Sequence, residues 1–471
     1  MSQENKFSNK FYHPIFLIFI YLVVHVVIRL SLSETFQVDD REQIFYAQEL
    51  LIGYPFPQPP LYSWISWISF KLFGSNLFSL TFVKYILIFS TFIVIWLISQ
   101  IIIENRKHDP ILLFSFLLMP SFFWHMHQGF THTILLSLGI VLVIFSLLKL
   151  REKNSIQNYI ALGLSMSILF LSKYSFLIFI FPIMISAFSI FSFRQTFLSP
   201  RILISLSILL LCVLPHYTWV YQNFFELSST IQNKLNIQEV QNVSTSSLSE
   251  FFLSSLGFIF PLVLFLFLAI KPKKINSCFE KNDYQKLFER FFLVIGFIMV
   301  LLSIFLSIGQ IKVRWLHPIW MLFPFWLILQ LERKEKISKK IIYLFKVTVV
   351  TLSLLIITVR IFQSTLAPSF GLSGRINVPI TETIRKIPHQ YIDDSLIITN
   401  DFVLLPHLIS YYPNKIKYGD YLINKDFQYT KCIYISSKKK GGIRVSDSYS
   451  TPYGNETYRL FLAEKDCQSY N

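Results

Sequence analysis

The stretch PIFLIFIYLVVHVVIRLSL, residues 14–32, decides the class of protein to which this chain belongs. A helix needs about 20 predominantly apolar residues to cross the hydrocarbon core of a bilayer, and this run meets that requirement. No small-residue cleavage site follows the run, so we expect a permanent membrane span rather than a removed signal peptide.

The remainder of the chain repeats this apolar pattern. Of its 471 residues, 53% are hydrophobic and only 15% are charged, whereas a soluble domain carries about 25% charged residues. Lipid must therefore solvate many of the apolar side chains, and we predict an all-α polytopic membrane protein with about eleven transmembrane helices. The predicted spans lie near residues 14–32, 82–103, 110–125, 131–149, 156–172, 175–192, 202–221, 251–270, 291–309, 315–331 and 341–362.

The formal net charge of +16 does not indicate a nucleic-acid partner. The Lys and Arg residues gather in alternate short loops between the apolar runs, as the positive-inside rule describes. This asymmetry places the N-terminus in the cytoplasm. With an odd number of spans, the last hundred residues then lie outside.

We therefore predict two domains. Residues 1–362 form a transmembrane domain whose first outer loop covers residues 33–81. Residues 363–471 form a small periplasmic α/β domain, because helical and strand patterns alternate there. The expected helices cover 381–387 and 403–411, and the expected strands cover 395–399, 432–436 and 459–463. Whether Cys432 and Cys467 form a disulfide stays open at this point.

The first outer loop contains the most informative polar residues. Asp39 and Asp40 follow directly after a membrane exit, and Arg41 comes next. Gln58 lies in a proline-rich turn, and Tyr62 lies in a helix that is predicted over residues 61–73. The adjacent acids suit either general-base catalysis or the N-terminus of a helix, where Asp is favoured.

A second group consists of cations at the outer ends of spans, namely Lys173 beside Tyr174, and Lys312 with Arg314. A cation costs about 2.5–3.5 kcal/mol at the bilayer centre and less at the edge. A bound phosphate would offset this cost through charge-assisted hydrogen bonds. The alternative is that these side chains reach to lipid headgroups.

Histidines form a third group. His125, His127 and His132 lie within one turn, and His317 follows Arg314. No carboxylate or thiol accompanies the histidine turn as a further ligand, so the polar lining of a cavity is favoured over a metal site.

Taken in this order, these motifs resemble those of the protein O-mannosyltransferase-like superfamily of polytopic glycosyltransferases, which is family 39-like with a C-type fold. The matching motifs are the adjacent acids, Gln-Pro-Pro-Leu-Tyr at 58–62, Leu-Ser-Lys-Tyr at 171–174 and Arg-Trp-Leu-x-Pro at 314–318. The closest likeness is to lipopolysaccharide galacturonosyltransferases. The lipid A aminoarabinose transferase is more distant, because this chain has Glu42 where that enzyme has arginine and Pro57-Gln58 where it has Glu-Lys.

The resemblance implies an enzyme that transfers a sugar, with galacturonic acid as the candidate, from a polyprenyl-phosphate donor to lipid A, lipopolysaccharide or another envelope acceptor. It implies a multi-pass protein of the bacterial inner membrane. Nothing in the sequence requires a cofactor or a metal, although Asp39 and Asp40 could hold a metal ion. The implied catalytic residues are Asp39 and Asp40. The implied donor-binding residues are Arg41, Lys173, Tyr174, Lys312 and Arg314, and the implied cavity residues are Gln58, Tyr62, His125, His127, His132 and His317. A transporter or flippase for a lipid-linked sugar is the alternative, which the lack of a visible internal repeat disfavours.

Overall fold

The computed structural model describes residues 4–55, 58–235, 246–269, 281–305, 316–333, 337–372, 374–413, 415–418, 421–422, 431–439, 444–453 and 456–465. The chain forms two compact units. Unit 1 comprises Met1–Tyr21, Leu51–Tyr62 and Ile86–Leu355, and unit 2 comprises Leu22–Leu50, Ser63–Tyr85 and Ile356–Asn471. This division differs from the predicted domains, because most of the first outer loop belongs with the tail.

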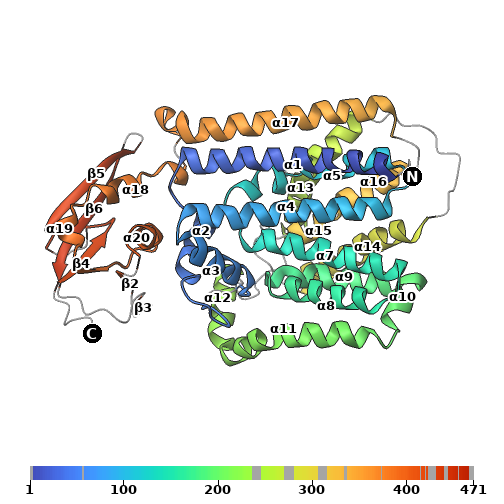
Figure 1. Cartoon of the computed structure of the whole chain (residues 1–471), viewed down its shortest axis with the longest axis horizontal. Coiled ribbons are helices and arrows are strands. Elements are labelled where there is room, and N and C mark those ends of the chain that lie inside the picture. The colour runs from blue at the N-terminus through green and yellow to red at the C-terminus, as the bar shows by residue number, and fades with distance from the viewer. Residues whose placement is uncertain are drawn as a thin grey trace. The chain divides into compact units, whose positions relative to one another are not determined.

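Unit 1 is helical throughout its described part, as the apolar runs predict (Figure 1). Helices α1 (Glu4–Leu32), α4 (Leu77–Ile102) and α17 (Lys339–Thr365) each continue from one unit into the other. The other helices of unit 1 are α5 (Asp109–Ser115), α6 (Pro120–Phe123), α7 (His132–Glu152), α8 (Ile156–Phe170), α9 (Leu177–Phe188), α10 (Phe191–Phe197), α11 (Ile202–Gln222), α12 (Phe224–Leu235), α13 (Ser246–Ala269), α14 (Asp283–Phe305), α15 (His317–Trp320) and α16 (Phe323–Arg333). Short 3₁₀ helices lie at Arg106–His108, Phe116–Leu118, His125–His127 and Tyr174–Phe176.

Among the described residues, five helices are long and apolar enough to cross a membrane, or up to seven if each of two bent pairs is one span. One pair, Arg106–Leu118 with Pro120–His127, is bent by 73°, and the other, Tyr174–Phe188 with Phe191–Phe197, by 109°. Pro120 accounts for the first bend, because a residue before proline avoids the helical conformation and Met119 is extended. The predicted class of fold is confirmed, whereas the number of about eleven crossings stays a prediction.

Small residues allow α7, α8 and α11 to pack closely. A Cβ atom added at Gly139 of α7 would lie 2.9 Å from the Leu169 Cα of α8. A Cβ atom added at Gly163 of α8 would lie 2.8 Å from the Ser205 carbonyl oxygen of α11. Hydroxyl groups add hydrogen bonds across the same interfaces, including Ser146 to Ser165 at 2.9 Å. Close packing through small residues and interhelical hydrogen bonds is how membrane helices associate without a hydrophobic driving force between them.

Gly163→Ala should lower the melting temperature of the detergent-purified protein. The new methyl group overlaps backbone atoms of α11, and overpacking of this kind costs about 1–3 kcal/mol. Gly296→Ala in α14 is the matched control, because a Cβ atom there meets nothing within 4 Å. Equal melting temperatures for the two variants would contradict the close approach of α8 and α11.

Unit 2 contains the outer-loop helices α2 (Val38–Tyr46) and α3 (Leu61–Phe73), the latter with the predicted boundaries. Its tail contains α18 (Ile380–Arg385), α19 (His389–Ile392), α20 (Leu405–Tyr411) and the strands β1 (Ser395–Ile398), β2 (Ile416–Tyr418), β3 (Tyr421–Leu422), β4 (Lys431–Ser436), β5 (Asp447–Tyr453) and β6 (Glu456–Lys465). Two 3₁₀ helices, Ala367–Phe370 and Arg375–Asn377, precede α18. The predicted small α/β domain is therefore confirmed.

The strands form one six-stranded sheet in the order β3-β2-β1-β4-β6-β5. The central strand β1 pairs in parallel with β2, placing Ile397 opposite Ile416, and with β4, placing Leu396 opposite Cys432. The pairs β2–β3, β4–β6 and β5–β6 are antiparallel. Helix α20 forms the crossover from β1 to β2, because parallel neighbours need such a connection.

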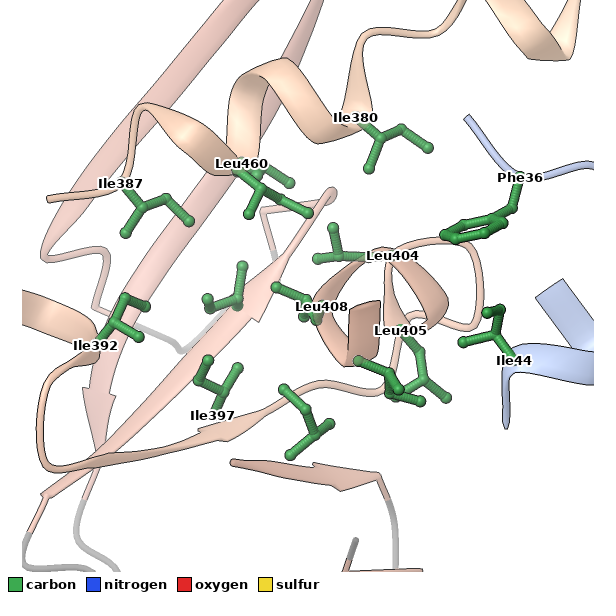
Figure 2. Close-up of a cluster of buried hydrophobic side chains, with 14 of the residues drawn as sticks. Phe36, Ile44, Ile380, Ile387, Ile392, Ile397, Leu404, Leu405, Leu408 and Leu460 are labelled. Atoms are coloured by element: carbon green, nitrogen blue, oxygen red, sulfur yellow. The ribbon is translucent and has the colours of Figure 1, made fainter. Parts of the chain in front are cut away.

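The first outer loop and the tail share one hydrophobic core. Phe36, Ile44 and Ala47 of the loop pack with Leu404 and Leu405 of the tail (Figure 2). The same core also includes Phe70, Leu80, Ile380, Ile384, Ile387, Ile392, Ile397, Leu408, Ile409, Ile416, Ile433, Ile435, Leu460 and Leu462. The loop helix α2, which has 9 residues, is too short to be stable alone in water. Its position therefore depends on this packing.

His407 is a buried titratable group that packs against this core. Its side chain is 1% exposed and lies against the Phe36 ring at 4.8 Å between centroids. Its Nδ1 atom is 3.3 Å from the Thr381 hydroxyl. Burial lowers the pKa of His407 to about 3, and the positive charges of Arg41 and Arg29 act in the same direction. The core therefore holds this imidazole in its neutral form.

The stability of unit 2 should fall as the pH drops below about 6.5, the pKa of an exposed histidine. The folded state binds the proton of His407 only near pH 3, so the unfolded state gains protons first. The loss should reach about 2 kcal/mol at pH 5 and be absent above pH 7. Thermal melts between pH 8 and pH 5 test this. The melting temperature of His407→Gln should change less with pH than that of the wild type, whereas the exposed His389→Gln should follow the wild type.

Candidate functional site

A buried ion-pair cluster surrounds Asp40 in unit 2. Lys84 Nζ of α4 donates to Asp40 Oδ1 at 3.0 Å, and Arg29 of α1 lies 3.9 Å from Asp40 Oδ2. Asp40 is 2% exposed, Lys84 4% and Arg29 8%. Arg29 also donates to the carbonyl oxygens of Ser33 at 2.7 Å and Thr35 at 2.6 Å. The cluster therefore ties α2 to the ends of two apolar helices.

A third basic side chain, Arg360 of α17, belongs to this cluster. It is buried, it donates to His25 Nδ1 of α1, and it lies within electrostatic range of Arg29 and of Tyr85 of α4. Arg29, Lys84 and Arg360 thus gather three basic side chains in a buried cluster beside Asp40. Basic side chains at the ends of apolar helices are costly and commonly functional.

Asp39 lies in a different environment although it precedes Asp40 directly. Both acids are in the first turn of α2, where the helix dipole favours negative charge. The N-cap residue is Gln37, which makes no side-chain cap hydrogen bond. Neither acid is therefore the helix cap. Asp40 is removed from solvent, whereas Asp39 is half-buried.

Arg41 extends from another side of α2. It interacts electrostatically with Asp401, Tyr458 and Arg375, all of which belong to the tail. Its Nε atom is buried and has no hydrogen-bond partner among the described residues.

Unit 1 holds a second set of predicted site residues around Lys173. Lys173 Nζ donates to the Thr133 hydroxyl at 2.8 Å. The neighbouring His132 ring has its Nδ1 atom 3.1 Å from the Ser172 carbonyl oxygen, and it lies 5.4 Å from the Tyr62 ring. The backbone N–H of Leu61 donates to the Leu171 carbonyl oxygen at 3.2 Å. The motif at 58–62 is therefore joined to the motif at 171–174.

His317 is completely buried in the same unit. Its Nε2 atom is 2.6 Å from the Ser137 hydroxyl, and its Nδ1 atom has no hydrogen-bond partner among the described residues. Lys173 and His125 lie within electrostatic range of its ring. His125 stacks on Phe130 at 5.5 Å. These contacts connect the histidine turn with Lys173 and with the start of α15.

The remaining predicted residues of unit 1 lie at the edges of this set. His127 Nε2 is 3.1 Å from the Tyr21 hydroxyl. The Tyr174 hydroxyl is 3.1 Å from His216 Nε2, and that histidine also contacts the backbone of the first loop. Gln58 is half-buried, and its Oε1 atom accepts no hydrogen bond from the described residues.

The structure thus groups Asp39, Asp40 and Arg41 in unit 2 and the Lys173 set in unit 1. The latter comprises Gln58, Tyr62, His125, His127, His132, Lys173, Tyr174 and His317. Lys312 and Arg314 lie outside the described residues.

Sequence reasoning did not select Arg29, Lys84 or Arg360 as site residues. A charge inside an apolar run was the available indication, because such residues in membrane spans are costly and commonly functional.

Within the part of the chain that the structure describes, no group of three or more His, Cys, Asp or Glu side chains is placed to hold a metal ion.

Comparisons with known proteins show which chains this sequence is similar to. The model of the dolichyl-phosphate-mannose-protein mannosyltransferase family matches residues 57–219. The lipopolysaccharide core galacturonosyltransferase RgtB of Rhizobium johnstonii is 24% identical over 393 residues, which are 82% of this chain and 79% of that protein. RgtA of the same organism, also a lipopolysaccharide core galacturonosyltransferase, is 23% identical over 81% of this chain and 77% of its own length.

Solved structures of ArnT from Cupriavidus metallidurans share the fold. The apo structure has a TM-score of 0.58 and the structure bound to undecaprenyl phosphate one of 0.59, each at 12% identity. Both cover 95% of this chain, and 97% and 98% of the respective ArnT chains. The predicted likeness to this superfamily of polytopic membrane glycosyltransferases is therefore confirmed, as is the prediction that the chain is a glycosyltransferase.

Asp40→Asn should destabilise the protein strongly. The change leaves Lys84 and Arg29 buried without their carboxylate, and breaking a buried pair costs about 3–5 kcal/mol. Thermal unfolding in detergent measures the loss, with Asp39→Asn as the neighbouring control that should unfold near the wild-type temperature. The double variant Asp40→Asn with Lys84→Met should recover part of the loss. Equal unfolding temperatures for Asp39→Asn and Asp40→Asn would contradict the assigned pairing.

Proposed function

We propose that this glycosyltransferase transfers galacturonic acid from a polyprenyl-phosphate donor to a lipopolysaccharide acceptor at the periplasmic face of the bacterial inner membrane. The likeness to two lipopolysaccharide core galacturonosyltransferases over about four fifths of the chain supports the sugar and the acceptor. The solved structure of similar fold that is bound to undecaprenyl phosphate supports the class of donor.

The observation that carries this proposal is the buried basic cluster beside Asp40. Arg29, Lys84 and Arg360 are all buried. They come from three apolar helices, α1, α4 and α17, each of which has one end in unit 2. The phosphate of a lipid-linked sugar supplies negative charge beside a hydrophobic chain, which is the ligand chemistry that such a cluster favours. When the sugar leaves, negative charge grows on a phosphate oxygen, and fixed cations stabilise that charge.

In this mechanism Asp39 is the general base. It accepts the proton of the acceptor hydroxyl while that oxygen attacks the anomeric carbon of the donor sugar. The bond from the anomeric carbon to the phosphate oxygen breaks, and polyprenyl phosphate leaves with the electron pair, so the configuration is inverted. Asp40 is buried and paired with two cations. We therefore assign Asp40 to the positioning of α2 and of the basic cluster.

The Lys173 set is assigned to the donor as well. Lys173, Tyr174, Lys312 and Arg314 are the proposed ligands of its phosphate and sugar. Gln58, Tyr62, His125, His127, His132 and His317 are the proposed polar lining for sugar hydroxyls. The buried Nδ1 atom of His317 and the Oε1 atom of Gln58, each without a hydrogen-bond partner among the described residues, support a polar ligand in this lining.

A periplasmic location of the tail is supported by two observations. The Lys and Arg residues between the predicted spans place the N-terminus inside and the tail outside. Cys432 is disulfide-bonded, and its partner lies outside the described residues. Disulfides persist in oxidising compartments such as the periplasm.

Mass spectrometry of lipopolysaccharide tests the function directly. Cells that express the protein should carry an additional mass of one hexuronic acid, and cells with Asp39→Asn should lack it because removing the base lowers the rate by about 10²–10⁴-fold. A membrane fraction of the variant should contain as much folded protein as that of the wild type.

Two results would reject parts of this proposal. If cells with Asp39→Asn carry fully modified lipopolysaccharide, Asp39 is not the general base. An unchanged lipopolysaccharide mass with and without the wild-type protein, together with movement of the lipid-linked sugar across vesicles by the purified chain, would identify a flippase instead.

A further inference from the structure

A polar cluster lies at the carboxyl edge of the tail sheet. The chain leaves β1 through α20 toward β2, whereas β4 lies on the opposite side of β1 and continues toward β5 and β6. Connections from neighbouring parallel strands thus diverge between β1 and β4. In open α/β sheets such a position, at the carboxyl ends of the strands, is where ligands bind. Asp401 follows β1 here, and Ser437 follows β4.

Asp401 is already occupied by contacts within the tail. Its Oδ1 atom accepts hydrogen bonds from the backbone N–H groups of Val403 at 2.9 Å and Leu404 at 3.4 Å. Its Oδ2 atom accepts a hydrogen bond from the Ser437 hydroxyl. The carboxylate therefore shapes the edge of the sheet and positions Ser437.

Two buried donors at this edge lack a partner among the described residues. One is Arg41 Nε of α2, and the other is the Tyr458 hydroxyl of β6. Tyr458 interacts with Ser437, Asp401 and Arg41, but its hydroxyl makes no hydrogen bond of good geometry with the described groups. An unsatisfied buried donor costs about 1–3 kcal/mol. A ligand that presents oxygen acceptors would satisfy both groups.

The surrounding charges specify an anionic ligand. The basic side chains are Arg41, Arg375 and the exposed Lys438 and Lys439, which follow Ser437. The acidic ones are Asp401 and Glu42. Among these described side chains the basic ones outnumber the acidic ones, and the oxygens of Asp401 are engaged. An arginine guanidinium and a neighbouring hydroxyl match the oxygens of a carboxylate or a phosphate.

This cluster lies on a different side of α2 from Asp39. Residues two apart on an α-helix leave it about 200° apart, so the side chains of Asp39 and Arg41 extend in nearly opposite directions. Phe45, one turn after Arg41, packs on Phe402 and Tyr418 of the tail. The face that carries Arg41 is therefore the tail-facing side of α2.

The size of the two substrates distinguishes which of them can reach Arg41. The single sugar of a donor must lie against Asp39, whereas an acceptor saccharide has further units that extend past the reacting hydroxyl.

We propose that Arg41 and the Tyr458 hydroxyl, beside Ser437, form a subsite that binds an oxyanion on the acceptor saccharide, separate from the reacting groups. This inference rests on the proposed function, and it changes the role expected for Arg41 from donor binding to acceptor binding. The oxyanion is the carboxylate of an acidic sugar or the phosphate of a phosphorylated one, which share the same recognition chemistry. The subsite selects an anionic acceptor and holds it while a distant hydroxyl reaches Asp39.

Kinetics of the purified full chain test the subsite. Tyr458→Phe removes only the hydroxyl and should raise the KM for a core oligosaccharide acceptor about tenfold, because a hydrogen bond to a charged group is lost. Arg41→Lys keeps the charge but removes the Nε–H donor, and it should raise the same KM. The KM for the polyprenyl-phosphate donor should stay within about twofold. Tyr449→Phe on β5 is the matched control, because the Tyr449 hydroxyl donates to Asp447 instead.

Two treated acceptors distinguish the sources of the oxyanion. The acceptor is used intact, after enzymatic removal of phosphate, and after reduction of its carboxyl groups. The treatment that raises the wild-type KM to the value of Tyr458→Phe identifies the bound group. If neither treatment changes the wild-type KM, or if Tyr458→Phe alters only the donor KM, the subsite is refuted.

Equilibrium binding separates this inference from the proposed function. Fluorescently labelled core oligosaccharide is titrated into the Asp39→Asn variant, with and without Tyr458→Phe, so that no turnover is involved. Weaker binding in the double variant supports the subsite even if wild-type protein transfers no sugar. Equal binding overturns the subsite even if wild-type protein transfers galacturonic acid normally.

Discussion

The buried pairing of Asp40 with Lys84 and Arg29 is the constraint on which unit 2 depends. Cations within apolar helices are costly unless they meet a negative group, and Asp40 is the carboxylate that meets them at 3.0 Å and 3.9 Å. The first turn of α2 must therefore lie where α1 and α4 present these charges. Because Asp39 is the neighbouring residue of the same turn, the pairing of Asp40 also determines where the backbone of Asp39 lies.

The tail supplies the second constraint on α2. Ile44 and Ala47 pack in a core whose other members come mainly from α18, α20 and the sheet. Phe45 contacts Phe402 and Tyr418, which also belong to the tail. A helix of 9 residues, held on one side by ion pairs and on another by a distant domain, has few alternative positions. The α/β domain thus stabilises the outer loop, in addition to any contact with a substrate.

The sequence predicted local structure well and long-range pairing poorly. The predicted bounds of α3 agree with the observed Leu61–Phe73. The predicted bounds of β1 and β4 agree with the observed ones to within one residue. The partners of Asp40 were not predicted, because Arg29 and Lys84 are isolated charges in apolar runs without a local motif. Arg360 is separated from His25 by 335 residues, so nothing in either segment specified their contact. The shared core of the loop and the tail was not predicted either. The apolar stripe of each segment is equally compatible with packing against lipid.

The adjacent acids show how one helical turn gives two carboxylates different chemistry. Consecutive residues leave a helix about 100° apart, so Asp40 can be buried among cations while Asp39 keeps access to solvent. Asp40 is held between two buried cations. The half-buried carboxylate beside it stays accessible, and environments that separate the behaviour of two neighbouring acids commonly distinguish their roles in catalysis. The pair Asp39-Asp40 is therefore not a redundant acidic patch, because Asp40 determines where α2 lies and Asp39 is left in place to react.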